Sequence, residues 1–156
     1  MTQDLLPRRI VVGLSGSLES FTALHRAVAE ARRCGAEVLA VLAVAPPLHA
    51  ADQIPLEVES AERQLTDLLE SAFGSGGPEG VPFAATAVLG SPGLALTQIA
   101  DRQGDLLIVG APRRRLRFPG SSTARHCAAR ATCPVLVVPL PFVPAVPADP
   151  QISAAR

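Results

Sequence analysis

The chain has 156 residues, of which 48% are apolar, and its 14 basic and 14 acidic residues give a formal net charge of zero. The length suits one domain, and the apolar fraction suffices for a substantial core. The balanced charge argues against a basic protein that collects nucleic acid over its surface. Because Trp and Tyr are absent, the core must consist mainly of Val, Leu, Ile and Ala.

The sequence shows no sign of export or membrane insertion. The N-terminus lacks the apolar segment of a signal peptide, and the longest apolar run, residues 38–48, is shorter than the roughly 20 residues a spanning helix needs. We expect a cytoplasmic protein with neither a membrane nor a nucleic-acid partner. Cys34, Cys127 and Cys133 are odd in number and lack CxxC spacing, so we expect reduced, structural thiols and no metal site.

Apolar runs and segments of helical periodicity alternate along the chain. We predict strands at residues 8–14, 37–45, 83–89, 105–109 and 134–138, and helices at residues 18–34, 56–73, 92–103 and 121–131. Ser17 is placed to cap the first helix, and Gly35 to end it in a left-handed conformation. Ser91 followed by Pro92 is typical of a helix start.

This strict alternation predicts an α/β fold. The expected architecture is a three-layer, doubly wound, five-stranded parallel sheet of order 3-2-1-4-5 with helices on both faces. The strand order reverses between the first and fourth strands, so the loops at residues 14–17 and 110–123 should converge on one crevice. We expect residues 1–7 to be a lead, residues 8–139 the domain, and the Pro-rich residues 140–156 a flexible tail.

The segment from Gly110 to Thr123 joins the fourth strand to the fourth helix. Glycine-bearing turns before a helix hold phosphate, because free backbone N–H groups and the positive end of the helix dipole meet there. Four arginines lie among residues 113–117 of this loop. An anionic ligand is therefore the first hypothesis for this loop, and a solvated surface loop is the alternative.

Several segments, in order and spacing, resemble the universal stress protein family. They are Ile10-Val-Val-Gly-Leu-Ser-Gly-Ser17, Gly90-Ser-Pro92, Asp105-Leu-Leu-Ile-Val-Gly110, Gly120-Ser121 and Cys133-Pro-Val-Leu-Val-Val138. The resemblance implies the sheet predicted above. It also implies a homodimer that pairs fifth strands, here Val135, Leu136, Val137 and Val138. Many members bind ATP through Gly-x-x-Gly-(nine residues)-Gly-Ser/Thr, whereas others lack this motif and do not.

The family motif carries over only in part. Gly110 matches its first glycine and Gly120-Ser121 its last pair, but Arg113 replaces the second glycine and the loop is three residues shorter. Ser15 stands where ATP-binding members usually have Asp beside the adenosine. The candidate nucleotide or anion site implied by the resemblance comprises Gly13, Ser15, Val44, Val109, Gly110, Pro112, Arg113, Gly120, Ser121, Ser122 and Thr123.

Three functions follow from these residues. The first is a non-catalytic, dimeric stress-response module with weak or no ATP binding, no required cofactor and a regulatory protein partner of unknown identity. The second is an ATP or related-nucleotide sensor that uses the Arg-rich loop. The third is an adenylating enzyme of the ATP pyrophosphatase type, whose phosphate loop residues 15–20 resemble, although Ser17 and Glu19 depart from it. No Ser–His–Asp arrangement is apparent, so no catalytic residue is predicted.

Overall fold

The computed structural model describes residues 5–46, 48, 54–112 and 122–141, and these form the predicted five-stranded parallel sheet. Its order is β3-β2-β1-β4-β5, and every neighbouring pair is parallel. The elements are β1 Arg9–Leu14, α1 Leu18–Cys34, β2 Glu37–Val44, α2 Ile54–Phe73, β3 Phe83–Leu89, α3 Pro92–Ile99, β4 Asp105–Gly110, α4 Thr123–Arg130 and β5 Val135–Val138. The predicted fold class and strand order are therefore confirmed.

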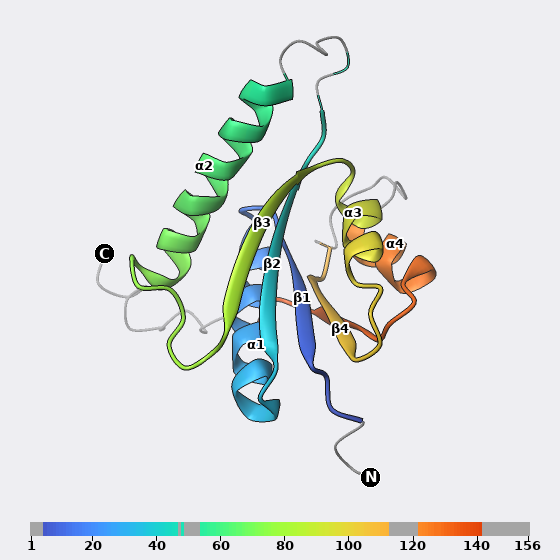
Figure 1. The fold of residues 1–156 in the computed structure, drawn as a ribbon. Helices are drawn as coiled ribbons and strands as arrows, with labels where there is room; N and C mark the ends of the chain where they lie inside the picture. Colours follow the sequence, from blue (N-terminus) through green and yellow to red (C-terminus); the bar gives the residue numbers. More distant parts are fainter. Residues whose placement is uncertain (1–4, 47, 49–53, 113–121, 142–156) are drawn as a thin grey trace, which may run out of the picture.

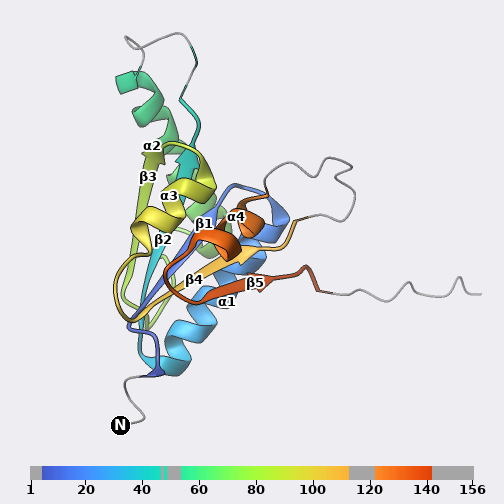
Figure 2. The same ribbon diagram turned by 90° about the vertical axis from the view of Figure 1, so that its right-hand side faces the viewer.

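The helices cover the two faces of the sheet in pairs (Figures 1 and 2). Helices α1 and α2 pack on one face, where Leu24 and Leu65 join a core cluster with Ile10 and Val38. Helices α3 and α4 pack on the other face, where Leu96 and Cys127 join residues of β1, β2 and β4. This arrangement follows from right-handed crossovers between parallel strands.

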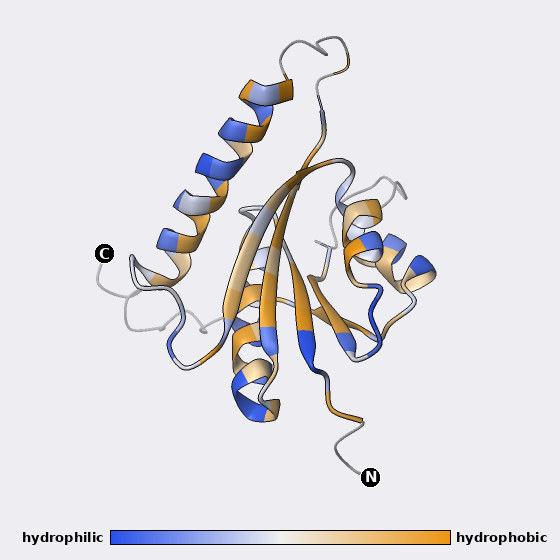
Figure 3. Ribbon diagram, viewed as in Figure 1, coloured by the Kyte–Doolittle hydropathy of each residue, from blue (hydrophilic) through white to orange (hydrophobic). Residues whose placement is uncertain are grey.

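Hydropathy along the strands explains why the sheet is buried (Figure 3). The strands are mostly apolar, as expected for a parallel sheet covered on both faces. Their hydrophilic residues lie at the N-terminal ends of β1, β2 and β4, which begin with Arg9, Glu37 and Asp105. The carboxyl ends of the strands are left lined by apolar residues and by the loops that follow them.

Local signals set most of the element boundaries. Helix α1 has the predicted bounds, its N-cap Ser17 accepts a hydrogen bond from the Ser20 amide, and Gly35 follows it at φ 74°. Helix α2 begins at Ile54, two residues before the prediction, and α4 begins at Thr123 after the N-cap Ser122. The prediction that the third helix reaches about residue 103 is wrong, because α3 ends at Ile99.

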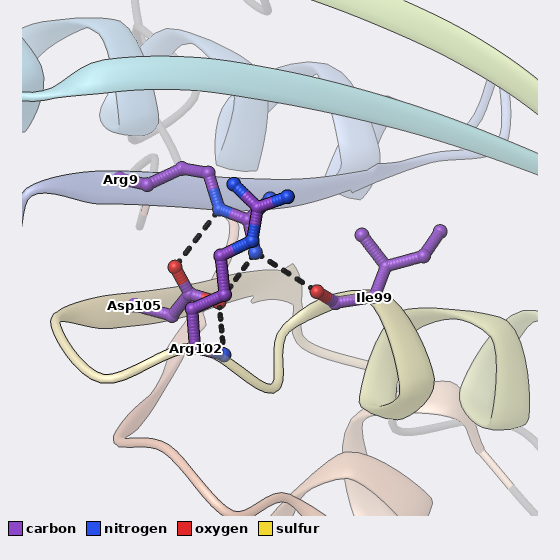
Figure 4. Close-up of polar contacts among 4 residues, drawn as sticks. All are labelled: Arg9, Ile99, Arg102 and Asp105. Carbon is purple, nitrogen blue, oxygen red and sulfur yellow. Dashed lines mark hydrogen bonds and ion pairs between the residues drawn. The ribbon is translucent and has the colours of Figure 1, made fainter.

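A buried ion pair accounts for the early end of α3 (Figure 4). Arg9 donates through Nε to Oδ1 of Asp105 at 2.9 Å and through Nη2 to Oδ2 at 2.6 Å. Nη2 also donates to the Ile99 carbonyl at 2.9 Å, and the Arg102 amide donates to Oδ2 of Asp105 at 2.9 Å. Arg9 thus satisfies a carbonyl at the helix end, and Asp105 holds the chain in a turn instead of a further helical turn.

Candidate functional site

A cavity of about 500 Å³ opens at the carboxyl ends of β1, β2 and β4, where the strand order reverses. This volume lies within the range of about 300–1,000 Å³ typical of small-molecule sites. The residues that line the cavity are Gly13, Leu14, Ser15, Ser17, Glu19, Ser20, Val41, Ala43, Pro92, Leu96, Val109, Gly110, Ala111, Pro112, Ser122, Thr123 and Ala124. The two loops predicted to converge therefore do meet, as far as their described residues show.

Three helices point their N-termini at this cavity. Ser17 caps α1, Pro92 is the first residue of α3, and Ser122 caps α4, and all three line the cavity. Each helix N-terminus carries a partial positive charge, so their convergence creates a positive potential that favours an anion. Pro92 has no N–H to donate, so the first residue of α3 supplies no backbone donor.

Hydroxyl groups organise the loop between β1 and α1. The Ser20 hydroxyl accepts from the Ser15 amide at 3.2 Å and donates to the Ser17 carbonyl at 2.8 Å. The Ser15 and Ser17 hydroxyls lie 3.1 Å apart in a further hydrogen bond. Ser15 is thus held within its own loop, and its hydroxyl offers a ligand neutral hydrogen bonding in place of a carboxylate charge.

Two glycines in the cavity wall are required by close packing. A Cβ added to Gly110 would lie 2.6 Å from the Glu19 carbonyl oxygen and 2.8 Å from the Glu19 Cβ, so the end of β4 presses against the first turn of α1. A Cβ added to Gly13 would lie 2.8 Å from Cδ1 of Leu96, which is 2% exposed. Gly13 therefore gives Leu96 the room to form part of the cavity wall.

The predicted site residues divide into three groups. Gly13, Ser15, Val109, Gly110, Pro112, Ser122 and Thr123 line the cavity. Arg113, Gly120 and Ser121 lie outside the described residues, as do the other arginines of the loop. Val44 does not line the cavity, because side chains alternate along a strand. Val41 and Ala43 of β2 face the cavity, whereas Val44 packs with the cluster under α1 and α2.

The sequence analysis did not predict part of the cavity wall. Pro92 and Leu96 come from α3, which the motif does not include, although Gly90-Ser91-Pro92 marked that helix start. Glu19 is 7% exposed and also lines the cavity. Its position in the first turn of α1, next to the loop that follows β1, could have indicated this from the sequence.

The remaining reactive side chains lie away from the cavity lining. The pKa of Cys127 is raised to about 11, first by burial and then by the nearby Cys133, whose own pKa burial also raises. His126 packs against Gly93, and His25 makes an edge contact with Phe73 at 5.3 Å between ring centres. In the described part of the chain no three His, Cys, Asp or Glu side chains gather as a metal site requires, and no helix has the length and hydropathy to cross a membrane.

Comparisons with known proteins agree with the fold. Residues 7–139 match the family described as the universal stress protein family. A universal stress protein solved in complex with cAMP is 26% identical, with a TM-score of 0.58, over 85% of this chain and 97% of that one. A member from Burkholderia pseudomallei is 24% identical, with a TM-score of 0.59, over 85% of this chain and 96% of that one.

A structure from Archaeoglobus fulgidus in complex with dAMP is 19% identical, with a TM-score of 0.53, over 85% of this chain and 97% of that one. This structure and the Burkholderia one are each under 25% identical to this chain, so the likeness to them shows a shared fold alone. No curated protein matches the sequence. The family match spans most of the chain, and the solved members share its fold. The chain therefore belongs to the universal stress protein family.

Proposed function

We propose that the protein is a non-catalytic module of the stress response that binds an adenine nucleotide reversibly in the cavity between β1, β4 and α4. The convergence of three helix N-termini on a cavity of about 500 Å³ carries this proposal. The relative at 26% identity, solved with cAMP, supports the choice of nucleotide class.

ATP itself should bind weakly. Ser15 brings a neutral hydroxyl where many ATP-binding members carry a carboxylate, and Arg113 replaces a motif glycine in a shortened loop. Among the described residues, the cavity wall combines small apolar side chains with serine and threonine residues, which are Ser15, Ser17, Ser20, Ser122 and Thr123.

A pair of matched substitutions tests nucleotide binding. Ala43 lines the cavity on β2, and Ala84 is an exposed alanine on the neighbouring β3. We expect Ala43→Trp to fill the cavity and abolish the rise in melting temperature that cAMP causes, whereas Ala84→Trp leaves this rise unchanged. A ligand at about a hundred times its Kd stabilises the folded state by about 2.7 kcal/mol, which thermal melting followed by circular dichroism resolves easily.

The result for the unsubstituted protein decides the proposal. If saturating cAMP, AMP and ATP all leave its melting temperature unchanged, the nucleotide proposal is wrong and the nucleotide-free interaction module stands. A copurified nucleotide offers a second test, because the chain lacks Trp and Tyr and adenine would dominate its ultraviolet absorbance.

We also propose that two copies pair through β5. This strand is an edge of the sheet, it is entirely apolar, and Val137 is 37% exposed on it. Unpaired apolar edges favour association, while Pro139 limits how far such a ladder can extend. We expect Val137→Lys to convert a dimer to a monomer in analytical ultracentrifugation, whereas Leu56→Lys, at an exposed position on α2, has no effect. A monomeric unsubstituted protein would contradict the proposal.

A further inference from the structure

Helix α2 extends past the end of the sheet that it covers. It has 20 residues and therefore spans about 30 Å. Its buried residues are Ala61 and Leu65, and Leu68 lies against the loop at Gly16. In Figures 1 and 2 the N-terminal end of the helix extends beyond the strands. The first two turns therefore have no sheet beneath them, and residues 54–62 are called the α2 overhang below.

The core-facing stripe of α2 continues into the overhang. Residues three, four and seven positions apart share a helix face, so Ile54 and Val58 lie in line with Ala61 and Leu65. Ala61 is 3% and Leu65 7% exposed, whereas Ile54 is 44% and Val58 37% exposed. The same apolar stripe is thus buried over the sheet and uncovered beyond it.

Acidic side chains flank the uncovered part of the stripe. At 100° per residue, Glu57 and Glu62 lie on either side of it. Within the described part of the chain no ion pair joins these two to a basic side chain, whereas Glu59 pairs with Arg63. The whole helix carries five acidic residues and one basic residue. The overhang therefore suits a segment that combines basic with apolar side chains.

The chain itself contains such a segment, the arginine run, to which the proposed function gives no role. Residues 113–118 hold four arginines together with Leu116 and Phe118, and no other stretch of the sequence is as basic. Their charge of +4 balances the net −4 of α2 within a chain of zero net charge. This segment leads to α4, and α2 and α4 pack on opposite faces of the sheet. The match is therefore one between two copies of the chain.

We propose that residues 113–118 of one copy dock on the α2 overhang of a second copy. The arginines face the two unpaired glutamates of the overhang, and Leu116 and Phe118 cover its apolar stripe. Because the contact joins two different surfaces, it is heterologous and links successive copies into larger assemblies. It is separate from the nucleotide cavity and from pairing through β5, and salt weakens it because its charged groups are exposed.

A labelled peptide of residues 112–119, added to the full-length protein and followed by fluorescence anisotropy, tests the contact. We expect the double substitution Glu57→Gln and Glu62→Gln to weaken binding of this peptide about tenfold, because two surface ion pairs are lost. Glu70→Gln removes an exposed charge from the other end of α2 and is the matched control. It should change the Kd by less than about twofold.

Apolar substitutions distinguish docking from general attraction between opposite charges. The double substitution Ile54→Ser and Val58→Ser keeps every charge and should weaken peptide binding about tenfold, because the apolar contact is lost. A peptide with Leu116→Ser and Phe118→Ser keeps all four arginines and should bind the unsubstituted protein more weakly by a similar factor. Equal binding of the two peptides would refute the proposed contact.

Full-length chains decide whether the partner is a second copy. In sedimentation velocity at low salt, the unsubstituted protein should form larger assemblies than a variant with Arg114→Glu and Arg115→Glu, and about 0.5 M salt should dissociate them. The salt series uses the unsubstituted protein, so it does not depend on the folding of any variant. If assembly size is independent of salt, or if neutral Glu57 and Glu62 leave peptide binding unchanged, the inference is wrong and the proposed function is unaffected. Peptide binding without association of the full-length chains would indicate a different basic partner and would likewise refute it.

Discussion

Breaking the buried Arg9–Asp105 pair should destabilise the fold strongly, because removal of either partner leaves a charge without its counterion. The Asp105 side chain is 1% exposed and the Arg9 side chain 11%. The substitution Asp105→Asn keeps the size of the side chain but leaves the Arg9 guanidinium without a carboxylate. Breaking a buried pair in this way costs about 3–5 kcal/mol, which is a large part of the roughly 5–15 kcal/mol that stabilises an ordinary domain.

The assay is urea unfolding followed by far-ultraviolet circular dichroism, because the chain has no Trp or Tyr for fluorescence. Glu30→Gln is the matched control, since Glu30 pairs with the exposed side chains of Arg26 and Arg33 on α1. We expect the control to lose less than about 1 kcal/mol. If Asp105→Asn loses no more than the control does, the buried pair is not the stabilising feature described here.

The pH dependence gives the same prediction an independent check. Burial raises the pKa of Asp105, but the hydrogen bonds from Arg9 and the Arg102 amide outweigh burial and hold it below its ordinary value. A carboxyl with a lowered pKa stabilises the fold above its unfolded pKa of about 3.9, and this contribution is lost as the pH falls through the folded value. The difference between the unsubstituted protein and Asp105→Asn should therefore be constant near neutral pH and shrink in acid.

Three further predictions concern the cavity wall and the buried thiol. Gly110→Ala places a Cβ against backbone atoms of Glu19 and should destabilise the protein by about 1–3 kcal/mol in urea unfolding; an unchanged midpoint would contradict this close packing. Ser122→Ala removes the side-chain acceptor for the Arg125 amide at the start of α4 and should lower the free energy of unfolding by about 1 kcal/mol in the same assay. An unchanged free energy of unfolding would show that this cap does not stabilise the protein. Cys127 is fully buried and its pKa is about 11, so iodoacetamide at mildly alkaline pH should alkylate it only after unfolding, as peptide mass spectrometry would show. Rapid labelling of the folded protein would show that α4 opens.

Local sequence signals were sufficient to predict the boundaries of those elements that are set by residues close together in the sequence. The Ser17 cap, the left-handed Gly35 and the apolar periodicity between them defined α1 at both ends. The alternation of strands and helices indicated a parallel sheet with right-handed crossovers, and the predicted order 3-2-1-4-5 is one of several doubly wound orders that such an alternation allows. The crevice between the first and fourth strands followed from that order, and the cavity lies there.

The end of α3 and the positions of Val44 and Glu19 could not be predicted, because they depend on contacts between residues far apart in the sequence. The end of α3 depends on Arg9, which is 96 residues from Asp105 in the chain, so no local pattern could place it. Val44 is not among the described lining residues, because the family resemblance located the end of β2 but not which face of the sheet that residue presents. Glu19 could be placed on a helix from the sequence, but its burial against Gly110 emerges only from the packing of α1 on β4.

The retention of Gly110 is not by itself a sign of nucleotide binding. In the ATP-binding motif a glycine at this position lets the backbone approach phosphate, yet in this chain the same glycine is needed for β4 to pass the first turn of α1. A chain that had lost its ligand would still require it. Lining residues that packing does not require are therefore more informative about the ligand than Gly110 is. Ser15 belongs to that lining, and its neutral hydroxyl distinguishes this cavity from that of members with a carboxylate at this position.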